Sequence, residues 1–350
     1  MKIGILTASR TDNNGTNLQA LAMLNLFRRL GGKNVELINY VCEKIDCESR
    51  HSLTLHRIVF YPIILFNKIQ HKSFRKKYFR KSHELYTDEN INKIQYDAVV
   101  VGSDQIWNLD LTGGDLSFYL PFQSNIRKYS YAASFGIAKT EMWEKKYQIQ
   151  KLLSDFNGVS VRELSGVEAL NKIGIKGRCD LDPILMGDSN DWKSFTIPAN
   201  KHNYILLYLV AYDPMAIEYA QSLGKQFGYE VIMLNPGLKS WKNVKRYFFV
   251  SVQKWLNLMA NASMVITNSY HGLSFAILFK RNFRLCLLPE NSANNKRMID
   301  LLRIMDLEDF ILTKDFDSCK PIDWENAYNN LNPYIRNSEN YIKKILNDSI

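Results

Sequence analysis

Apolar runs of strand length alternate with helix-like stretches along most of the chain. In the first half, strand-like runs occur at residues 2–7, 35–40, 96–101, 129–133, 158–161 and 180–185. Residues 16–30 place leucines on one stripe and end at two glycines, which predicts a helix. A second helix is expected over residues 141–155.

The second half repeats this alternation after residues 187–203, a polar segment that we expect to be a linker. Strands are expected at residues 204–210, 230–234, 264–267 and 284–288. Helices are expected at residues 214–227 and 251–260, from about His271 onward, and at residues 339–346. Continuous apolar strands separated by helices predict parallel, doubly wound sheets.

The pattern predicts an α/β fold of two Rossmann-like domains that face a cleft. The N-terminal domain is expected over residues 1–190 and the C-terminal domain over residues 200–350, closed by the last helix. The length agrees, because 350 residues exceed the roughly 250–300 at which single cores stop growing. Ligands of open α/β sheets bind at the carboxyl ends of strands, so residues that follow strands are the functional candidates.

A polar loop follows the first strand and contains Asn14, Gly15 and Asn17. Free backbone N–H groups at the start of the next helix favour an anion or a sugar hydroxyl there. A capped turn without a ligand explains the same residues. The loop is neither a GxGxxG sequence nor a P-loop, so it does not indicate a nucleotide.

A second polar loop, after residues 96–101, begins with Gly102, Ser103 and Asp104. The glycine permits close approach, and Asp104 can accept a proton or hydrogen bonds from sugar hydroxyls. Trp107 can stack on a sugar ring or fill the core, and we expect the core.

Arg162 stands at the tip of an apolar strand, where a buried guanidinium requires an anionic partner. Its two-pronged geometry suits the carboxylate or phosphate of a ligand. The alternative is an ion pair within the protein, for which Glu163 is a neighbour.

His271 follows the strand at 264–267 together with Ser269 and Tyr270. The start of a helix attracts phosphate, and a histidine there can transfer protons near neutral pH. A structural histidine is the alternative, but the position between a strand and a helix favours function.

The net charge of +10 is concentrated in one segment, residues 49–83. This segment has nine cations and no acid, and removing them from the 45 Lys and Arg leaves 36 against 35 Asp and Glu. It also contains large apolar residues, namely Phe60, Tyr61, Phe66, Phe74, Tyr78 and Phe79. Such a mixture fits an interfacial helix on an anionic membrane, or an insertion that packs on its own domain. No nucleic-acid motif accompanies it.

The cysteines and the apolar stretches limit the cellular compartment and the kinds of site that we expect. Five scattered cysteines without a CxxC pair predict neither disulfides nor a zinc site. The start of the sequence has no signal-peptide core, and the longest apolar stretch, residues 58–66, is too short to span a membrane. We therefore expect a cytoplasmic protein, with peripheral contact to the inner face of the cell membrane as the open question.

Six segments occur in an order that resembles the polysaccharide pyruvyl transferase family. They are NNGTNLQALAML near the start, GSDQIWN (Gly102–Asn108), YSYAASFG (Tyr129–Gly136), SVRE (Ser160–Glu163), DLDPIL (Asp180–Leu185) and TNSYHGLSFAI (Thr267–Ile277). The resemblance covers roughly residues 1–310.

The resemblance implies a glycosyltransferase-B-like pair of domains that uses phosphoenolpyruvate as donor. The family places pyruvate as a ketal on two hydroxyls of a glycan sugar, in bacterial capsule or exopolysaccharide synthesis. The acceptor is expected on a polyprenyl carrier, and no metal or organic cofactor is expected.

The same resemblance implies roles for particular residues. Arg162 matches the family's arginine and is the expected anion clamp, and His271 matches the family's histidine and is the expected general acid. Lys296 and Arg297, in an Asn-rich loop before a helix, are a looser second anion contact, and plain exposure to solvent is the alternative for both. Some members carry Arg before the histidine, where this chain has Tyr270, so another cation must serve there.

Two other functions remain open. A sugar-nucleotide glycosyltransferase of the same fold usually carries two glutamates about eight positions apart near this helix, and no acid follows His271 before Glu290. A non-catalytic scaffold of a polysaccharide-assembly complex would bind neither donor nor acceptor.

Overall fold

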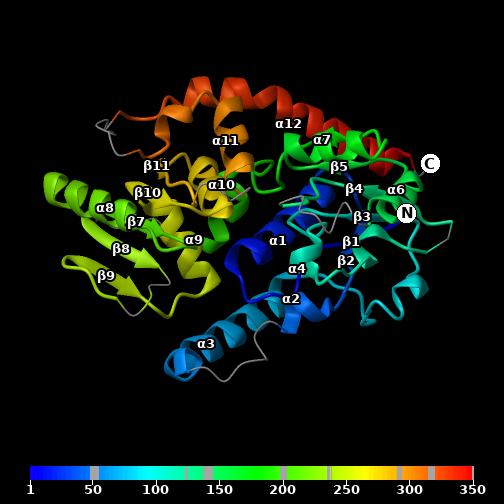
Figure 1. The fold of residues 1–350 in the computed structure, drawn as a ribbon, viewed down its shortest axis with the longest axis horizontal. Helices are drawn as coiled ribbons and strands as arrows, with labels where there is room; N and C mark the ends of the chain where they lie inside the picture. The colour runs from blue at the N-terminus through cyan, green and yellow to red at the C-terminus, as the bar shows by residue number, and fades with distance from the viewer. Residues whose placement is uncertain are drawn as a thin grey trace. The chain divides into compact units, whose positions relative to one another are not determined.

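The computed structural model describes residues 1–47, 55–122, 125–136, 145–197, 203–234, 237, 239–289, 294–313 and 320–348. The chain divides into two compact units. Unit 1 comprises Met1–Ile58, His71–Met186 and Asn332–Ile350, and unit 2 comprises Val59–Gln70 and Gly187–Leu331. Each unit has its own parallel sheet (Figure 1).

Unit 1 has a parallel sheet with the strand order β2-β1-β3-β4. These strands are β1 (Lys2–Leu6), β2 (Asn34–Leu37), β3 (Ala98–Val101) and β4 (Arg127–Ser130). Bridges from Tyr129 to Gly158 and from Ala133 to Val161 extend it with the paired β5 (Ser160–Val161) and β6 (Arg178–Cys179). Because β2 and β3 lie on opposite sides of β1, the order reverses between β1 and β3. Open α/β sheets bind ligands at such a switch point.

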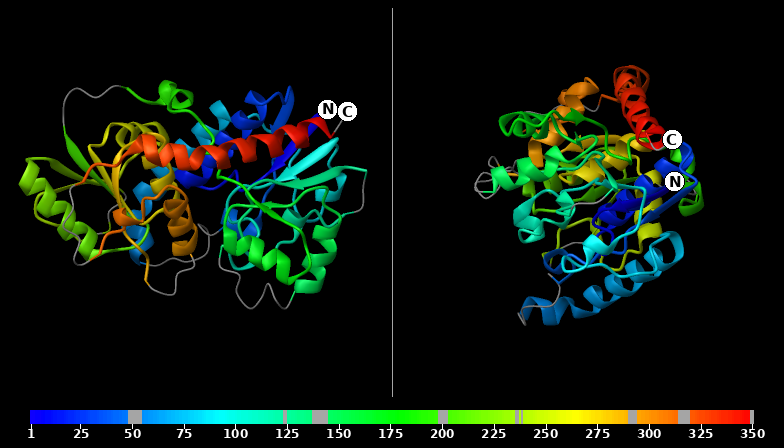
Figure 2. Two further views of the ribbon diagram at one scale, coloured as in Figure 1. Left: turned by 90° about the horizontal axis from the view of Figure 1, so that it is seen from above. Right: turned by 90° about the vertical axis from the view of Figure 1, so that its right-hand side faces the viewer.

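Helices cover both faces of the unit 1 sheet (Figure 2). On one face, Phe27 of α1 (Asn14–Arg29) meets the ring of Tyr131 at 6.0 Å, and Tyr341 of α12 (Trp324–Asn347) donates to the carbonyl oxygen of Ser130. The other face carries α6 (Lys146–Ser154) and α7 (Leu164–Lys172), whose buried residues join the core beneath β3 and β5. The smaller helices are α2 (Glu43–Cys47) and α4 (Leu109–Thr112).

Unit 2 repeats this topology with the strand order β11-β10-β7-β8-β9. Its strands are β7 (Tyr204–Tyr208), β8 (Glu230–Leu234), β9 (Val244–Tyr247), β10 (Met264–Thr267) and β11 (Asn282–Leu285). Its helices include α8 (Pro214–Phe227), α9 (Val252–Asn261), α10 (Tyr270–Leu278) and α11 (Asn294–Ile304). The switch point lies between β7 and β10, and the α/β fold class is confirmed.

The long helix α3 (Leu55–Tyr78) forms most of the predicted basic insertion. Its middle belongs to unit 2, where Phe66 meets the ring of Phe249 at 5.4 Å. Its end belongs to unit 1, where Phe74 is buried and contacts the ring of Phe79. These aromatic residues are therefore partly or wholly core, as expected for the alternative of an insertion that packs on the protein itself. Residues 48–54 of the predicted insertion lie outside the described part of the chain.

The units differ from the predicted domain ranges in two places. The middle of α3 joins unit 2, and the chain from Asn332 onward returns to unit 1. The predicted linker also packs, because Trp192 is buried against the ring of Phe275 at 5.3 Å.

Two predicted elements also differ, and one strand was not predicted. Residues 180–185 form an irregular segment that ends in a turn from Pro183 and not a strand, whereas β9 has too little apolar character to be recognised. Helix α12 begins far before the predicted residue 339 and continues through Pro333. Among the described helices, none combines the length and the apolar character that crossing a bilayer requires.

Candidate functional site

The loop after β3 places Ser103 and Asp104 at the switch point of unit 1. Gly102 has φ +126°, and a Cβ there would lie 2.1 Å from the carbonyl oxygen of Tyr131, so only glycine fits. Ser103 is buried, and its Oγ donates to Oδ2 of Asp182 over 3.2 Å. The predicted close approach of Gly102 is therefore to the protein's own backbone.

Trp107 fills the core, as predicted. Its indole Nε1 donates to the carbonyl oxygen of Phe118 over 2.8 Å, and its ring stacks on Tyr119 at 5.4 Å. Since its indole N–H is used and the side chain is buried, Trp107 supports the loop from below.

The start of α1 joins this loop through a hydrogen bond. Asn13 caps the helix by accepting from the backbone N–H of Thr16, which is the predicted capped turn. Thr16 in turn donates from Oγ1 to Oδ2 of Asp104 over 3.0 Å. The two polar loops at the ends of β1 and β3 are thus in direct contact.

The predicted substrate residues Asn14, Gly15 and Asn17 are all buried in the first turn of α1. Nδ2 of Asn17 donates to the carbonyl oxygens of Thr11 and Asn13, and it lies 3.0 Å from Nδ1 of His71. Among the described residues, Oδ1 of Asn14 and Oδ1 of Asn17 have no hydrogen-bond partner. Buried acceptors of this kind are normally satisfied by water or a ligand.

Arg162 forms a buried ion pair with Asp182. Its Nη1 donates to Oδ2 of Asp182 over 2.8 Å, and its Nη2 lies 3.9 Å from Oδ1 of Asp104. Glu163 accepts hydrogen bonds from Oγ of Ser134 and from the backbone N–H of Phe135. The ion-pair alternative is present, with Asp182 as partner, and the role of Arg162 as an anion clamp stays a prediction.

In unit 2, His271 is the second residue of α10, directly after the switch-point strand β10. Ser269 caps the helix by accepting from the backbone N–H of Gly272 over 3.3 Å. A Cβ at Gly272 would lie 2.5 Å from Oγ1 of Thr267, so this glycine brings the helix close to the strand. No acid occupies the first turn, which leaves the positive end of the helix dipole uncompensated.

Asn268 fixes the neighbouring loop after β7. Its Oδ1 accepts from the backbone N–H of Val210 over 2.7 Å, and its Nδ2 donates to the carbonyl oxygen of Ala211 over 2.8 Å. Both sides of the switch point are therefore held together by one buried amide.

Arg297 is brought to this site by α11. Its guanidinium carbon lies 4.9 Å from the centre of the Tyr270 ring, and the rings of Tyr270 and His271 are 5.8 Å apart. Arg297 and Lys296 lie in the first turns of a helix and not in a loop, which corrects the prediction. Lys296 is exposed.

The predicted residues thus form two clusters. In unit 1, Asp104 is adjacent to Thr16 and to Arg162. In unit 2, Tyr270 lies between His271 and Arg297.

The sequence matches the family model described as polysaccharide pyruvyl transferase over residues 14–287. The chain belongs to the polysaccharide pyruvyl transferase family. The resemblance of the six segments is thereby confirmed, and membership of this family implies a transferase. No curated protein matches the sequence significantly.

Solved structures of similar fold include nucleotide-sugar enzymes. The UDP-GlcNAc 2-epimerase from Methanocaldococcus jannaschii is 13% identical, with a TM-score of 0.54 and 99% of each chain covered. That from Neisseria meningitidis is 10% identical, with a TM-score of 0.53 over 100% of this chain and 99% of the other. The glycosyltransferase SnogD from Streptomyces nogalater is 10% identical, with a TM-score of 0.50 over 100% of both. At these identities the likeness shows only the fold, which is the predicted glycosyltransferase-B-like fold.

Sequence reasoning missed Asp182, Thr16 and Asn268 as parts of these clusters. Asp182 lies in the family segment DLDPIL, so the resemblance contained the signal. Thr16 and Asn268 were recognisable only as polar residues next to strand ends. Their partners depend on which loops the sheet order makes neighbours.

Proposed function

We propose that this transferase moves the pyruvyl group of phosphoenolpyruvate onto two hydroxyls of one glycan sugar, as a ketal. Family membership supports the transferase class. The structural observation that carries the proposal is the start of α10, where His271 stands at a switch point with Arg297 beside its neighbour Tyr270. A general acid and a guanidinium beside a helix start suit a small, multiply charged anion.

The proposed reaction has two additions and one departure. One sugar hydroxyl attacks C2 of phosphoenolpyruvate while His271 protonates the methylene carbon, which becomes a methyl group. The bond from C2 to the phosphate oxygen then breaks, and the second hydroxyl attacks C2 to close the ketal. One hydroxyl proton replaces the proton that His271 donated, and the other leaves with hydrogen phosphate. The donor supplies the reacting group, so no metal or organic cofactor enters the proposal.

Arg297 is the proposed replacement for the arginine that some family members carry before the histidine. Tyr270 occupies that position in the sequence, and the Arg297 guanidinium lies over its ring. A guanidinium can bind a phosphate or carboxylate through two parallel hydrogen bonds, and this is the role proposed for Arg297.

The proposed acceptor residues are those of unit 1. Sugar hydroxyls are hydrogen-bond donors, and Oδ1 of Asn14 and Oδ1 of Asn17 are buried acceptors without a hydrogen-bond partner among the described residues. Asp104 adds a carboxylate that is partly exposed. Such a set suits a neutral, hydroxyl-rich ligand.

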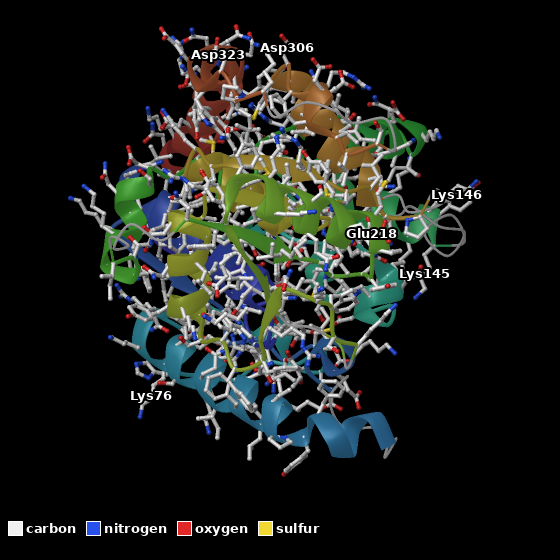
Figure 3. The ribbon with its side chains drawn as sticks, turned by 90° about the vertical axis from the view of Figure 1, so that its left-hand side faces the viewer. Lys76, Lys145, Lys146, Glu218, Asp306 and Asp323 are labelled. Atoms are coloured by element: carbon white, nitrogen blue, oxygen red, sulfur yellow. The ribbon has the colours of Figure 1, made fainter. Side chains whose placement is uncertain are left out.

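We place the reaction in bacterial capsule or exopolysaccharide synthesis, on a polyprenyl-linked acceptor at the cytoplasmic face of the membrane. One side of α3 supports this location, because Tyr61, Leu65 and Ile69 recur every fourth residue and are 60%, 43% and 60% exposed. Three exposed lysines lie along the same helix, Lys68, Lys72 and Lys76, and Lys76 points away from it (Figure 3). Exposed apolar residues flanked by cations favour an anionic membrane surface.

The test is release of phosphate from phosphoenolpyruvate in the presence of lipid-linked glycan acceptors. We expect release only when both substrates are present. Transfer from a nucleotide sugar without phosphoenolpyruvate would instead establish a glycosyltransferase. A protein that binds neither phosphoenolpyruvate nor the glycan acceptor would favour the non-catalytic scaffold.

A further inference from the structure

Three cations from separate parts of unit 1 converge on the loop after β1. Arg10 belongs to the loop itself, Arg75 to the end of α3, and Lys81 to the segment that follows α3. Lys81 donates from Nζ to the carbonyl oxygen of Ser9 over 3.1 Å, and Arg75 donates to the carbonyl oxygen of Thr11. The basic insertion therefore turns two of its cations inward, onto a loop at the switch point.

The backbone fixes these cations in place. Lys81 forms a parallel bridge with Leu37, which adds its segment to the edge of β2. Arg10 donates from Nη1 to Oδ1 of Asn39 over 2.9 Å, in the chain just after β2. These backbone and side-chain contacts hold the cations in place before a ligand binds. A preformed site of this kind reduces the ordering cost of binding.

Positive charge exceeds negative charge in this cluster. Two carboxylates face it, with Asp12 lying 3.3 Å from Nη1 of Arg75 and Asp46 lying 3.6 Å from Nε of Arg10. Burial, followed by repulsion from Arg10 and Arg75, lowers the pKa of Lys81 to about 7. Burial also raises the pKa of Asp46 to about 6, against the opposing effect of the cations. Burial is the larger cause of both shifts, so an anion bound beside Lys81 would favour its protonated form.

Two further features indicate an anion. The Oγ of Ser9 is buried and has no hydrogen-bond partner among the described residues. Helix α1 begins at the end of this same loop and has no acid in its first turn. A hydroxyl donor, a helix start and three cations are what a phosphate group requires.

We infer that Arg10, Arg75 and Lys81 form a subsite for a phosphate or diphosphate group carried by the glycan acceptor. This inference rests on the proposed function for the identity of the acceptor. Polyprenyl-linked and nucleotide-linked sugars share this diphosphate chemistry. The subsite would hold the carrier end of the acceptor, whereas the open amide acceptors of α1 serve its sugar hydroxyls.

The direct test is calorimetric titration of the full-length protein with inorganic pyrophosphate. An Arg297→Gln background removes the proposed donor contact in unit 2. Within that background, Arg10→Gln and Lys81→Gln should each weaken binding about tenfold or more, because each removes one charged hydrogen bond. Lys93→Gln, which changes an exposed lysine of the same unit, should alter binding less than about twofold.

Melting temperatures show whether each variant is folded. Arg10 is the safer variant, because its side chain is 36% exposed. Folded Arg10→Gln and Lys81→Gln proteins that bind pyrophosphate as tightly as the Arg297→Gln parent would overturn the inference. This result is independent of whether any pyruvyl transfer occurs.

Acceptor kinetics then identify the source of the phosphate. Arg10→Gln should raise KM for a diphosphate-bearing acceptor, lipid-linked or nucleotide-linked, and leave KM for the free glycan unchanged. The carrier whose KM rises is the natural one. An equal rise for the free glycan would contradict a phosphate subsite. Absence of all transfer with intact pyrophosphate binding would reject the proposed function and retain the anion site.

Discussion

The guanidinium of Arg162 donates a hydrogen bond over 2.8 Å to the carboxylate of Asp182, and both side chains are buried. Asp182 also accepts from Ser103, in the loop that leads to Asp104. The pair therefore connects the end of β5 to the loop after β3. A buried pair of this kind orients its neighbours, whatever else Arg162 does.

Breaking this pair should destabilise unit 1. Arg162→Met leaves the Asp182 carboxylate uncompensated and should lower the free energy of unfolding by about 3–5 kcal/mol. Urea denaturation measures the change, with Lys93→Met as an exposed control. A change below about 0.5 kcal/mol would mean that the pair contributes no stability.

The clamp role of Arg162 needs a separate variant. Arg162→Lys keeps a positive charge near Asp182 but loses the forked geometry. If Arg162 also binds phosphoenolpyruvate, KM for phosphoenolpyruvate should rise in folded enzyme. An unchanged KM assigns Arg162 to the fold alone, and a change only in the acceptor KM assigns it to the sugar.

His271→Ala should remove most of the turnover and leave the melting temperature nearly unchanged. General acid catalysis typically contributes about 10²–10⁴-fold, and the half-buried side chain fills little of the core. Phosphate release from phosphoenolpyruvate measures kcat. The exposed His83→Ala is the matched control and should keep full activity. A His271→Ala enzyme with near wild-type rate would end the assignment of His271 as proton donor.

Arg297 and Lys296 offer a matched pair of cations on one helix. Arg297→Gln should raise KM for phosphoenolpyruvate about tenfold or more, because its guanidinium lies beside the residue that precedes His271. Lys296→Gln, one residue away and exposed, should change KM less than about twofold. Equal effects of the two would indicate general electrostatic attraction and not a specific contact.

Membrane association should depend on the outward side of α3. Changing Lys68, Lys72, Lys76 and Lys77 to Glu should abolish flotation with anionic liposomes, because each cation near such a surface contributes about 1 kcal/mol. Arg75 is excluded from this set because it turns inward to Thr11. Wild-type flotation should weaken at high salt.

The control changes four exposed lysines of unit 1 that lie outside α3 to Glu, namely Lys93, Lys151, Lys172 and Lys176. This variant carries the same net charge and should still float. Wild-type protein that does not float with anionic liposomes at low salt would show that α3 is a solvated insertion.

His71 should make the protein sensitive to acid. Burial, followed by repulsion from Arg75, lowers the pKa of His71 from 6.5 to about 3. Between these pH values the unfolded chain binds the proton and the folded chain does not, so stability falls as the pH falls. The slope is at most about 1.4 kcal/mol per pH unit.

Chemical denaturation between pH 7 and pH 4 checks this linkage. His71→Gln should flatten the fall relative to wild type, because glutamine cannot take up the proton. His83→Gln, at an exposed position, should leave the slope unchanged. The same slope in His71→Gln and wild type would contradict the assignment.

The strands were predictable where apolar runs are short and well bounded. Strand β10 lies at the predicted residues, and β8 does too, because each contains an unbroken run of three or more apolar residues. Strand β9 was missed because Lys245 and Arg246 interrupt its apolar pattern at a sheet edge. Helix α12 was predicted only over residues 339–346, whereas it begins at Trp324 and continues through Pro333.

The chemical role of side chains at the strand ends was easier to predict than the residues with which they pair. Arg162 was recognised as a buried cation that requires an anion, but its partner depends on the parallel pairing of β5 with β6. Phe74 and Phe79 are buried, but the cations around them in the sequence fitted a membrane-facing helix as well as a packed insertion. Which side of α3 is buried depends on contacts with distant residues such as Phe249.

The fate of the acceptor shows whether the protein transfers pyruvate from phosphoenolpyruvate to a glycan as a ketal. Purified protein is incubated with phosphoenolpyruvate and lipid-linked oligosaccharides, and the products are analysed by mass spectrometry. We expect an acceptor that gains one pyruvate ketal, with one phosphate released for each ketal formed, and far less of both products with His271→Ala. Unchanged acceptors together with intact phosphoenolpyruvate, across glycans that carry a free hydroxyl pair, would contradict it.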